Sequence, residues 1–110
     1  MFEINNGKTQ ITKGTKKGIG YRSIPHDQKY DIHEISITQD QAFYMTSDGI
    51  LDQIGGPKRL GFGKKRLMNL LVEIQGKSMS DQMTTINQAL LEYQGDESRR
   101  DDISVIGFKL

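Results

Sequence analysis

The 110-residue chain contains no cysteine, and this absence excludes several kinds of chemistry. Without thiols the chain can form no disulfide, no thiolate zinc site and no cysteine nucleophile. A protein that needs no disulfides fits a reducing compartment, so we expect a cytoplasmic location. The first residues also lack the basic start and apolar core of a signal peptide, and we expect no secretion.

Charge of one sign and long hydrophobic runs are also missing. Fifteen basic against fourteen acidic residues give a formal net charge of +1, so no overall field favours nucleic acid or a membrane surface. No apolar run approaches the roughly 18 residues of a membrane-spanning helix. We therefore expect neither nucleic acid nor a membrane as a partner. The length fits one small domain or a part of a larger one.

Short apolar and alternating runs predict an antiparallel sheet. The expected strands are residues 2–4, 9–12, 34–38, 42–46 and 103–108. Asn6 and Gly7 both tolerate positive φ and favour a hairpin between the first two strands. The alternation in 34–38 and the more continuous apolar run in 42–46 predict a second hairpin, whose second strand is the more deeply buried. The last run is β-branched and largely apolar, as expected of an interior strand.

Two segments carry the spacing of amphipathic helices. Apolar residues at positions 67, 70, 71 and 74 share one helical face, and Gly76 ends this helix. A second helix is expected from Ser78, whose spacing to Asp81 resembles a capping box, to Gly95. Its methionines are interpreted as core residues, not ligands. The predicted fold class is α+β, an antiparallel β-sheet packed by two amphipathic helices.

Two acidic motifs stand beside predicted strands. Asp48-Gly49 follows the fourth strand, and Asp101-Asp102 precedes the last. Carboxylates at strand ends are rigidly held oxygen ligands of the kind that Mg²⁺ and Mn²⁺ prefer. The simpler alternative is turn chemistry, because Asp-Gly is common at turns and aspartates before a strand can be solvated. From these residues alone both interpretations stay open.

Several motifs taken together resemble a known family. They are Lys17-Gly18-Ile19-Gly20-Tyr21, Asp48-Gly49-Ile50-Leu51-Asp52-Gln53, Gly61-Phe62-Gly63-Lys64-Lys65-Arg66 and Asp101-Asp102-Ile103-Ser104-Val105-Ile106-Gly107. In order and spacing they are similar to the metal-dependent protein phosphatases of the protein phosphatase 2C-like (PPM) superfamily. The similarity is greatest to the bacterial branch of sporulation stage II and stress-response phosphatases, and it covers nearly the whole chain.

The resemblance implies a serine/threonine protein phosphatase in an αββα sandwich, with a binuclear Mn²⁺ or Mg²⁺ centre. Asp48 and Asp101 match ligand positions, and a metal-activated water would attack phosphorus. Asp102 is expected to contact the ligands without binding the metal itself, or to stand at the entry of the last strand. Asp52 is expected to support the site or a third metal. The implied partner is a phosphorylated regulatory protein, for instance an anti-sigma-factor antagonist.

The chain departs from this family because it lacks an upstream acid-Gly motif and an Asp-x-x-Gly-His-Gly segment. Two carboxylates alone are too few ligands for tight Mg²⁺ or Mn²⁺ binding. Residues 1–110 are therefore interpreted as the C-terminal portion of a phosphatase domain, with no separate second domain and little activity alone. The alternative is a non-catalytic interaction module derived from a phosphatase. If a covering sheet is missing, we expect a homodimer through the exposed sheet face.

Five basic residues gather between the acidic motifs: Lys58, Arg59, Lys64, Lys65 and Arg66. They can guide a phosphorylated substrate to the metals, because Arg and Lys pair with phosphate, or they can belong to a solvated flap and helix start. A nucleotide-binding loop is not expected, since Phe62 stands where that motif needs lysine. His26 and His33 lack a catalytic partner in the pattern and are left out of the site.

Overall fold

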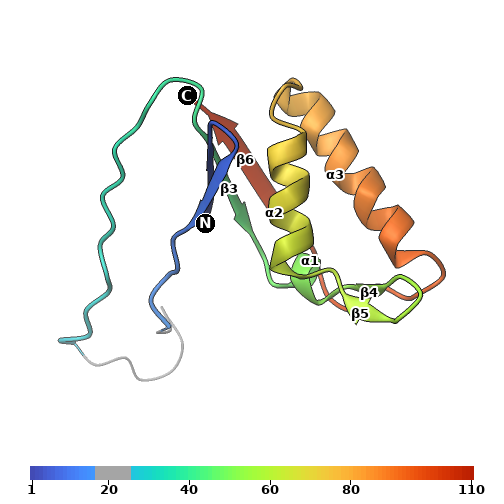
Figure 1. The fold of residues 1–110 in the computed structure, drawn as a ribbon. Coiled ribbons are helices and arrows are strands. Elements are labelled where there is room, and N and C mark those ends of the chain that lie inside the picture. Colours follow the sequence, from blue (N-terminus) through green and yellow to red (C-terminus); the bar gives the residue numbers. More distant parts are fainter. Residues whose placement is uncertain (17–25) are drawn as a thin grey trace.

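The computed structural model describes residues 1–16 and 26–110 (Figure 1). In chain order the elements are β1 (Phe2–Asn5), β2 (Lys8–Ile11), β3 (Ala42–Thr46), α1 (Gly49–Asp52), β4 (Ile54–Gly55), β5 (Leu60–Gly61), α2 (Gly63–Glu73), α3 (Met79–Gln94) and β6 (Val105–Lys109). Within these ranges no helix is long and apolar enough to cross a membrane. The motif at residues 17–21 lies outside the described residues.

The main sheet is antiparallel and has the strand order β2-β1-β3-β6. Its first hairpin is confirmed, since Asn6 and Gly7 turn the chain with φ of 50° and 75°. β3 is central, and Tyr44 lies opposite Phe2 of β1 and Gly107 of β6. A small second sheet pairs β4 with β5. The predicted α+β fold class is confirmed.

Helices α2 and α3 pack on one face of the main sheet (Figure 1). Successive side chains of a strand point to opposite faces, so alternate residues of β1 and β3 meet the apolar stripes of the helices. The buried core includes Phe2, Ile4, Ala42, Tyr44, Leu67, Leu71, Ile86 and Leu90. Ser78 caps α3, because its Oγ accepts a hydrogen bond of 3.2 Å from the Asp81 backbone N–H. Both predicted helices are therefore confirmed.

Two buried side chains, Tyr44 and Gln82, and the half-buried Gln75 join β3 to the two helices. The Tyr44 hydroxyl donates to Gln82 Oε1 on α3 and accepts a 2.9 Å hydrogen bond from Gln75 Nε2, just after α2. Burial raises the pKa of Tyr44, although both hydrogen bonds oppose this shift. Because a buried polar group without a partner is costly, the network fixes how the helices sit on the sheet.

The face of the sheet away from the helices is partly apolar and exposed. Phe43 stacks on Phe108 across β3 and β6, with ring centroids 5.2 Å apart. Met45, Ile106 and Phe108 are 49%, 64% and 38% exposed. The prediction of an interior last strand is therefore wrong: β6 ends the sheet, and among the described residues no strand pairs with its outer edge. Met83 of α3 lies beside this edge strand, β6. It is therefore 69% exposed and, contrary to the prediction, is not a core residue.

The predicted strand at residues 34–38 is also wrong, and with it the second hairpin. This segment has no strand assignment, and Ile37 is 61% exposed. β3 instead pairs with β1 and β6, so both of its edges are taken. An alternating pattern favours a strand only where a partner edge is free. The predicted hairpin needs an edge of β3, and both of these edges are occupied.

Candidate functional site

The two acidic motifs meet where β3 and β6 begin to separate. The Ser47 N–H donates to Ser104 O at 3.0 Å, and the Ser104 N–H donates to Ser47 Oγ at 2.9 Å. The Ser47 hydroxyl in turn donates to Asp102 O at 3.2 Å. Asp48 directly follows Ser47 and precedes α1. The loops that carry Asp48 and Asp102 are therefore held side by side.

Gly49 explains why the first motif is Asp-Gly. A Cβ atom built on Gly49 would lie only 2.1 Å from the carbonyl oxygen of Asp102. Real Cβ atoms do not approach backbone so closely, so glycine is needed for the two loops to touch. Gly49 is also the first residue of α1 and not part of an open turn. The local geometry thus favours a close approach between the motifs over ordinary turn chemistry.

All four candidate carboxylates, those of Asp48, Asp52, Asp101 and Asp102, are exposed. Asp48 stands at the N-cap of α1 but makes no side-chain cap hydrogen bond. Asp101 Oδ1 accepts a 2.7 Å hydrogen bond from the Asp102 N–H, which orients that carboxylate. Exposed carboxylates of this kind are available to a cation without first losing a buried partner.

The donors fit a hard divalent cation by chemistry but not by number. Carboxylate oxygens are the ligands that Mg²⁺ and Mn²⁺ prefer. Across residues 1–16 and 26–110, however, no group of three or more His, Cys, Asp or Glu side chains is placed to hold a metal ion. The assignment of Asp48 and Asp101 as ligands therefore stays a prediction, as do the roles of Asp52 and Asp102.

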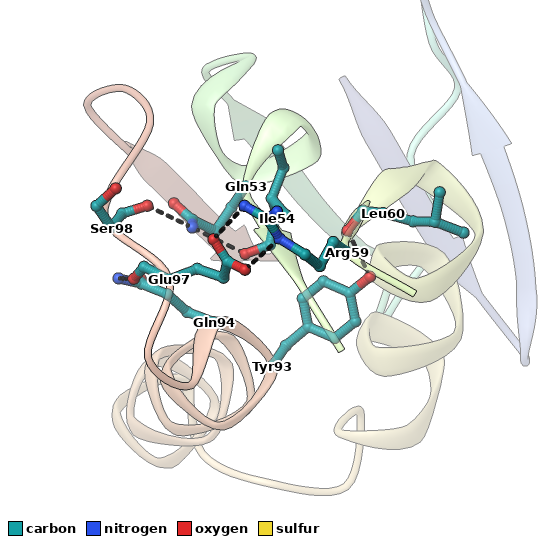
Figure 2. Close-up of polar contacts among 8 residues, drawn as sticks. All are labelled: Gln53, Ile54, Arg59, Leu60, Tyr93, Gln94, Glu97 and Ser98. Carbon is teal, nitrogen blue, oxygen red and sulfur yellow. Dashed lines mark hydrogen bonds and ion pairs between the residues drawn. The ribbon is translucent and has the colours of Figure 1, made fainter. Parts of the chain in front are cut away.

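The predicted basic residues lie on the β4–β5 hairpin and the start of α2. Two of them are engaged with the protein itself, and Figure 2 shows one of these, Arg59. Arg59 forms an ion pair with Glu97, with Nε 2.6 Å from Oε1, and this hydrogen bond lowers the pKa of Glu97. Arg66 lies 4.9 Å from the centre of the Tyr93 ring and donates to Phe62 O at 3.2 Å. The other three, Lys58, Lys64 and Lys65, are exposed.

The sequence pattern does not indicate the β4–β5 hairpin. Hydrogen bonds join this hairpin to the end of α3. The Gly56 N–H donates to Tyr93 O at 3.0 Å, and the Tyr93 hydroxyl donates to Leu60 O at 2.7 Å. A Cβ on Gly55 would lie 1.9 Å from Tyr93 O. The Gly55-Gly56 pair was the available signal, but a glycine pair indicates a loop and does not say what lies against it.

Gln53, the last residue before β4, was also missed. It is fully buried, at 0% exposure, and its side chain contacts the loop that leads to Asp101 (Figure 2). Gln53 stood within a motif that pointed to the family, but no spacing in the sequence indicates that its amide reaches across to residues 98–100. Only its burial next to the acidic loops shows that it belongs to the site.

Comparison with known proteins identifies a family and a fold. The family model of stage II sporulation protein E (SpoIIE) matches residues 5–110. A solved structure, the SiaA-PP2C domain of Pseudomonas aeruginosa, is 31% identical in sequence and superposes with a TM-score of 0.85. That match covers 99% of this chain and 42% of the other, so this chain spans less than half of that one. No curated protein sequence matches.

The family match and the structural match define this chain as part of the class of PPM-type phosphatase domains. Within that class, the chain belongs to the stage II sporulation protein E family. The resemblance drawn from the acidic motifs is thereby confirmed.

Proposed function

We propose that the chain is the C-terminal portion of a metal-dependent serine/threonine protein phosphatase domain. The observation that supports this most is the contact of Gly49 with the Asp102 carbonyl, which brings the two acidic loops together. The loops carry the carboxylates that match the ligand positions of the family. A phosphatase of this kind needs carboxylates and no side-chain nucleophile, in keeping with a chain free of cysteine.

In the proposed enzyme, Asp48 and Asp101 hold Mn²⁺ or Mg²⁺, and Asp52 and Asp102 support them. When bound, such a metal would lower the pKa of a water molecule and neutralise charge on the phosphoryl group. Asp101 is already oriented by the hydrogen bond from the Asp102 N–H. Cationic groups that are free of ion pairs attract a phosphoryl group more readily than paired ones. Among the described residues no ion pair involves the exposed lysines at positions 58, 64 and 65. Arg59 pairs with Glu97 and Arg66 donates to Phe62 O, so the three lysines suit phosphosubstrate contact better.

We expect the 110-residue chain to hydrolyse an aryl phosphate far more slowly than a version extended upstream to a complete domain. The reason is ligand number, because hard divalent cations need six or more oxygen donors and this chain offers few. The measurement is the Mn²⁺-dependent rate of both versions at equal concentration, with chelator as the blank. Equal rates would show that the site is complete within residues 1–110.

A second function, a non-catalytic interaction module, is favoured by one observation, the exposed apolar sheet face. Met45, Ile106 and Phe108 lie together on β3 and β6, and such a face tends to be covered by another protein surface. We propose that in this chain it is covered by a second copy. For both functions, the phosphatase and the interaction module, we propose that the phosphorylated partner is a cytoplasmic regulatory protein, such as an anti-sigma-factor antagonist.

Substituting Ile106 by lysine is expected to abolish the homodimer. The lysine would place a charge in the middle of the apolar face, where a second copy would have to desolvate it. Sedimentation velocity over a range of protein concentrations measures the change. Leu91→Lys is the matched control, because Leu91 is 51% exposed on α3 and away from that face. A wild-type chain that stays monomeric at high concentration would contradict the proposal.

A further inference from the structure

The loop between α3 and β6, residues 95–104, has no regular secondary structure but carries Asp101 and Asp102. Such a loop keeps one position only through contacts with its neighbours. Ser47 and Gly49 hold its second half, near Asp102. Its first half is held by a different residue, Gln53.

Both ends of the Gln53 side-chain amide form hydrogen bonds with backbone atoms, and Figure 2 shows those of Nε2. Nε2 donates to Ser98 O at 3.1 Å and to Ile54 O at 3.0 Å. Oε1 accepts from the Arg100 N–H at 3.3 Å. A carboxamide supplies a donor and an acceptor together, and a carboxylate or a thioether does not. Glutamine is therefore matched to the two backbone groups that the loop presents.

Gln53 lies close to both acidic motifs, to one along the chain and to the other through its side chain. α1 runs from Gly49 to Asp52, so Gln53 lies one short helix after Asp48. Its own backbone is fixed by a 2.9 Å hydrogen bond from the Phe62 N–H to Gln53 O. Its side-chain amide accepts a hydrogen bond from the N–H of Arg100, the residue directly before Asp101. The side chain thus connects the segment of one acidic motif to the segment of the other.

The Arg59–Glu97 ion pair also reaches this loop, but it is a weaker anchor. The Arg59 side chain is 72% exposed, and exposed ion pairs contribute little because water and salt screen them. Gln53 is buried, where hydrogen bonds are stronger and unpaired groups are costly. The amide of the buried Gln53 is therefore a stronger anchor for the first half of the loop than the ion pair is.

We propose that Gln53 is a positioning residue that sets the separation of Asp48 and Asp101 and hence the cation geometry of the site. This inference rests on the proposed phosphatase function for its metal part, and its structural part stands on the hydrogen bonds alone. Gln53 is not a ligand, since its amide is occupied by backbone partners.

The test compares Gln53→Met with Gln82→Met in the full chain. Gln82 is a matched control, because it is 1% exposed and its amide bonds with Tyr44 and Lys77 O, away from the acidic loops. NMR follows two quantities in each variant. One is amide hydrogen exchange at Arg100 relative to Phe43 in the central strand, and the other is the Mn²⁺ concentration that broadens the Gly49 and Asp102 amide signals.

In Gln53→Met we expect Arg100 exchange to accelerate roughly tenfold more than Phe43 exchange, because the part-buried hydrogen bond that the Arg100 N–H makes is lost locally. We also expect the Mn²⁺ concentration for half-broadening to rise roughly tenfold, as when residues that orient a ligand are removed, and to change less than about twofold in Gln82→Met. Equal exchange ratios in the two variants, or equal Mn²⁺ responses, would overturn the proposal. If the wild-type chain shows no Mn²⁺ broadening, the metal function fails for this chain, and the exchange comparison alone decides on Gln53.

Discussion

Gly49→Ala is expected to lower the free energy of unfolding by about 1–3 kcal/mol or more, as overpacking of a close contact does. The added Cβ would lie 2.1 Å from Asp102 O and 2.9 Å from Asp102 C, which are backbone atoms. Backbone cannot move aside as the end of a flexible side chain can. The loops of Asp48 and Asp102 would have to part, and the Ser47 hydrogen bonds would weaken with them. Urea unfolding at equilibrium measures the loss.

Gly76→Ala is the control for this substitution. No atom lies within 4 Å of the Cβ position at Gly76, and its φ is not positive. Alanine there should leave stability unchanged or raise it by about 0.4–1 kcal/mol, through a less flexible unfolded chain. If Gly49→Ala proved as stable as Gly76→Ala, the contact between the acidic loops would not be a real constraint on the fold.

Asp48→Asn and Asp101→Asn are expected to abolish most Mn²⁺-dependent hydrolysis in an upstream-extended version of the protein. Removing a residue that merely orients a ligand typically costs roughly 10–100-fold in affinity or activity, so loss of a ligand should cost at least about 100-fold. Both carboxylates are exposed, so stability should change little. The measurement is the initial rate on an aryl phosphate as Mn²⁺ is titrated, alongside urea unfolding.

Asp40→Asn serves as the matched control for charge. Asp40 is exposed, has a φ of 64° that asparagine also adopts, and lies 3.9 Å from Lys109 Nζ at the far end of β6. The Asp40→Asn variant should hydrolyse the aryl phosphate at the wild-type rate. A rate above a tenth of wild type in Asp48→Asn would remove this residue from the metal site. If Asp48→Asn lost Mn²⁺-dependent hydrolysis while Asp101→Asn kept the wild-type rate, Asp48 would be the single metal ligand of the two.

The elements that could be predicted are those whose signals are local. The α3 helix has a capping serine at Ser78 and a repeating apolar stripe that any packed surface would bury. The first hairpin follows from Asn6 and Gly7, which adopt positive φ at little cost. Neither signal depends on what lies elsewhere in the chain.

The strand errors have the opposite cause. Residues 34–38 alternate as a strand should, and Val105–Lys109 is rich in β-branched and apolar residues. Pairing and burial, however, depend on which edge and which face are free. β3 gives its two edges to β1 and β6, which leaves residues 34–38 no edge of β3 to pair with and places β6 at the end of the sheet.

By itself, the sequence determined the helices, the first hairpin and the two acidic motifs, because each follows from spacing along the chain, and the resemblance of its motifs indicated the family. Only the tertiary structure decided that the motifs touch, through Gly49 against Asp102 and through the amide of Gln53. Those contacts join residues about fifty positions apart, and their strength comes from close packing and buried hydrogen bonds. Neither leaves a periodic or compositional trace in the sequence.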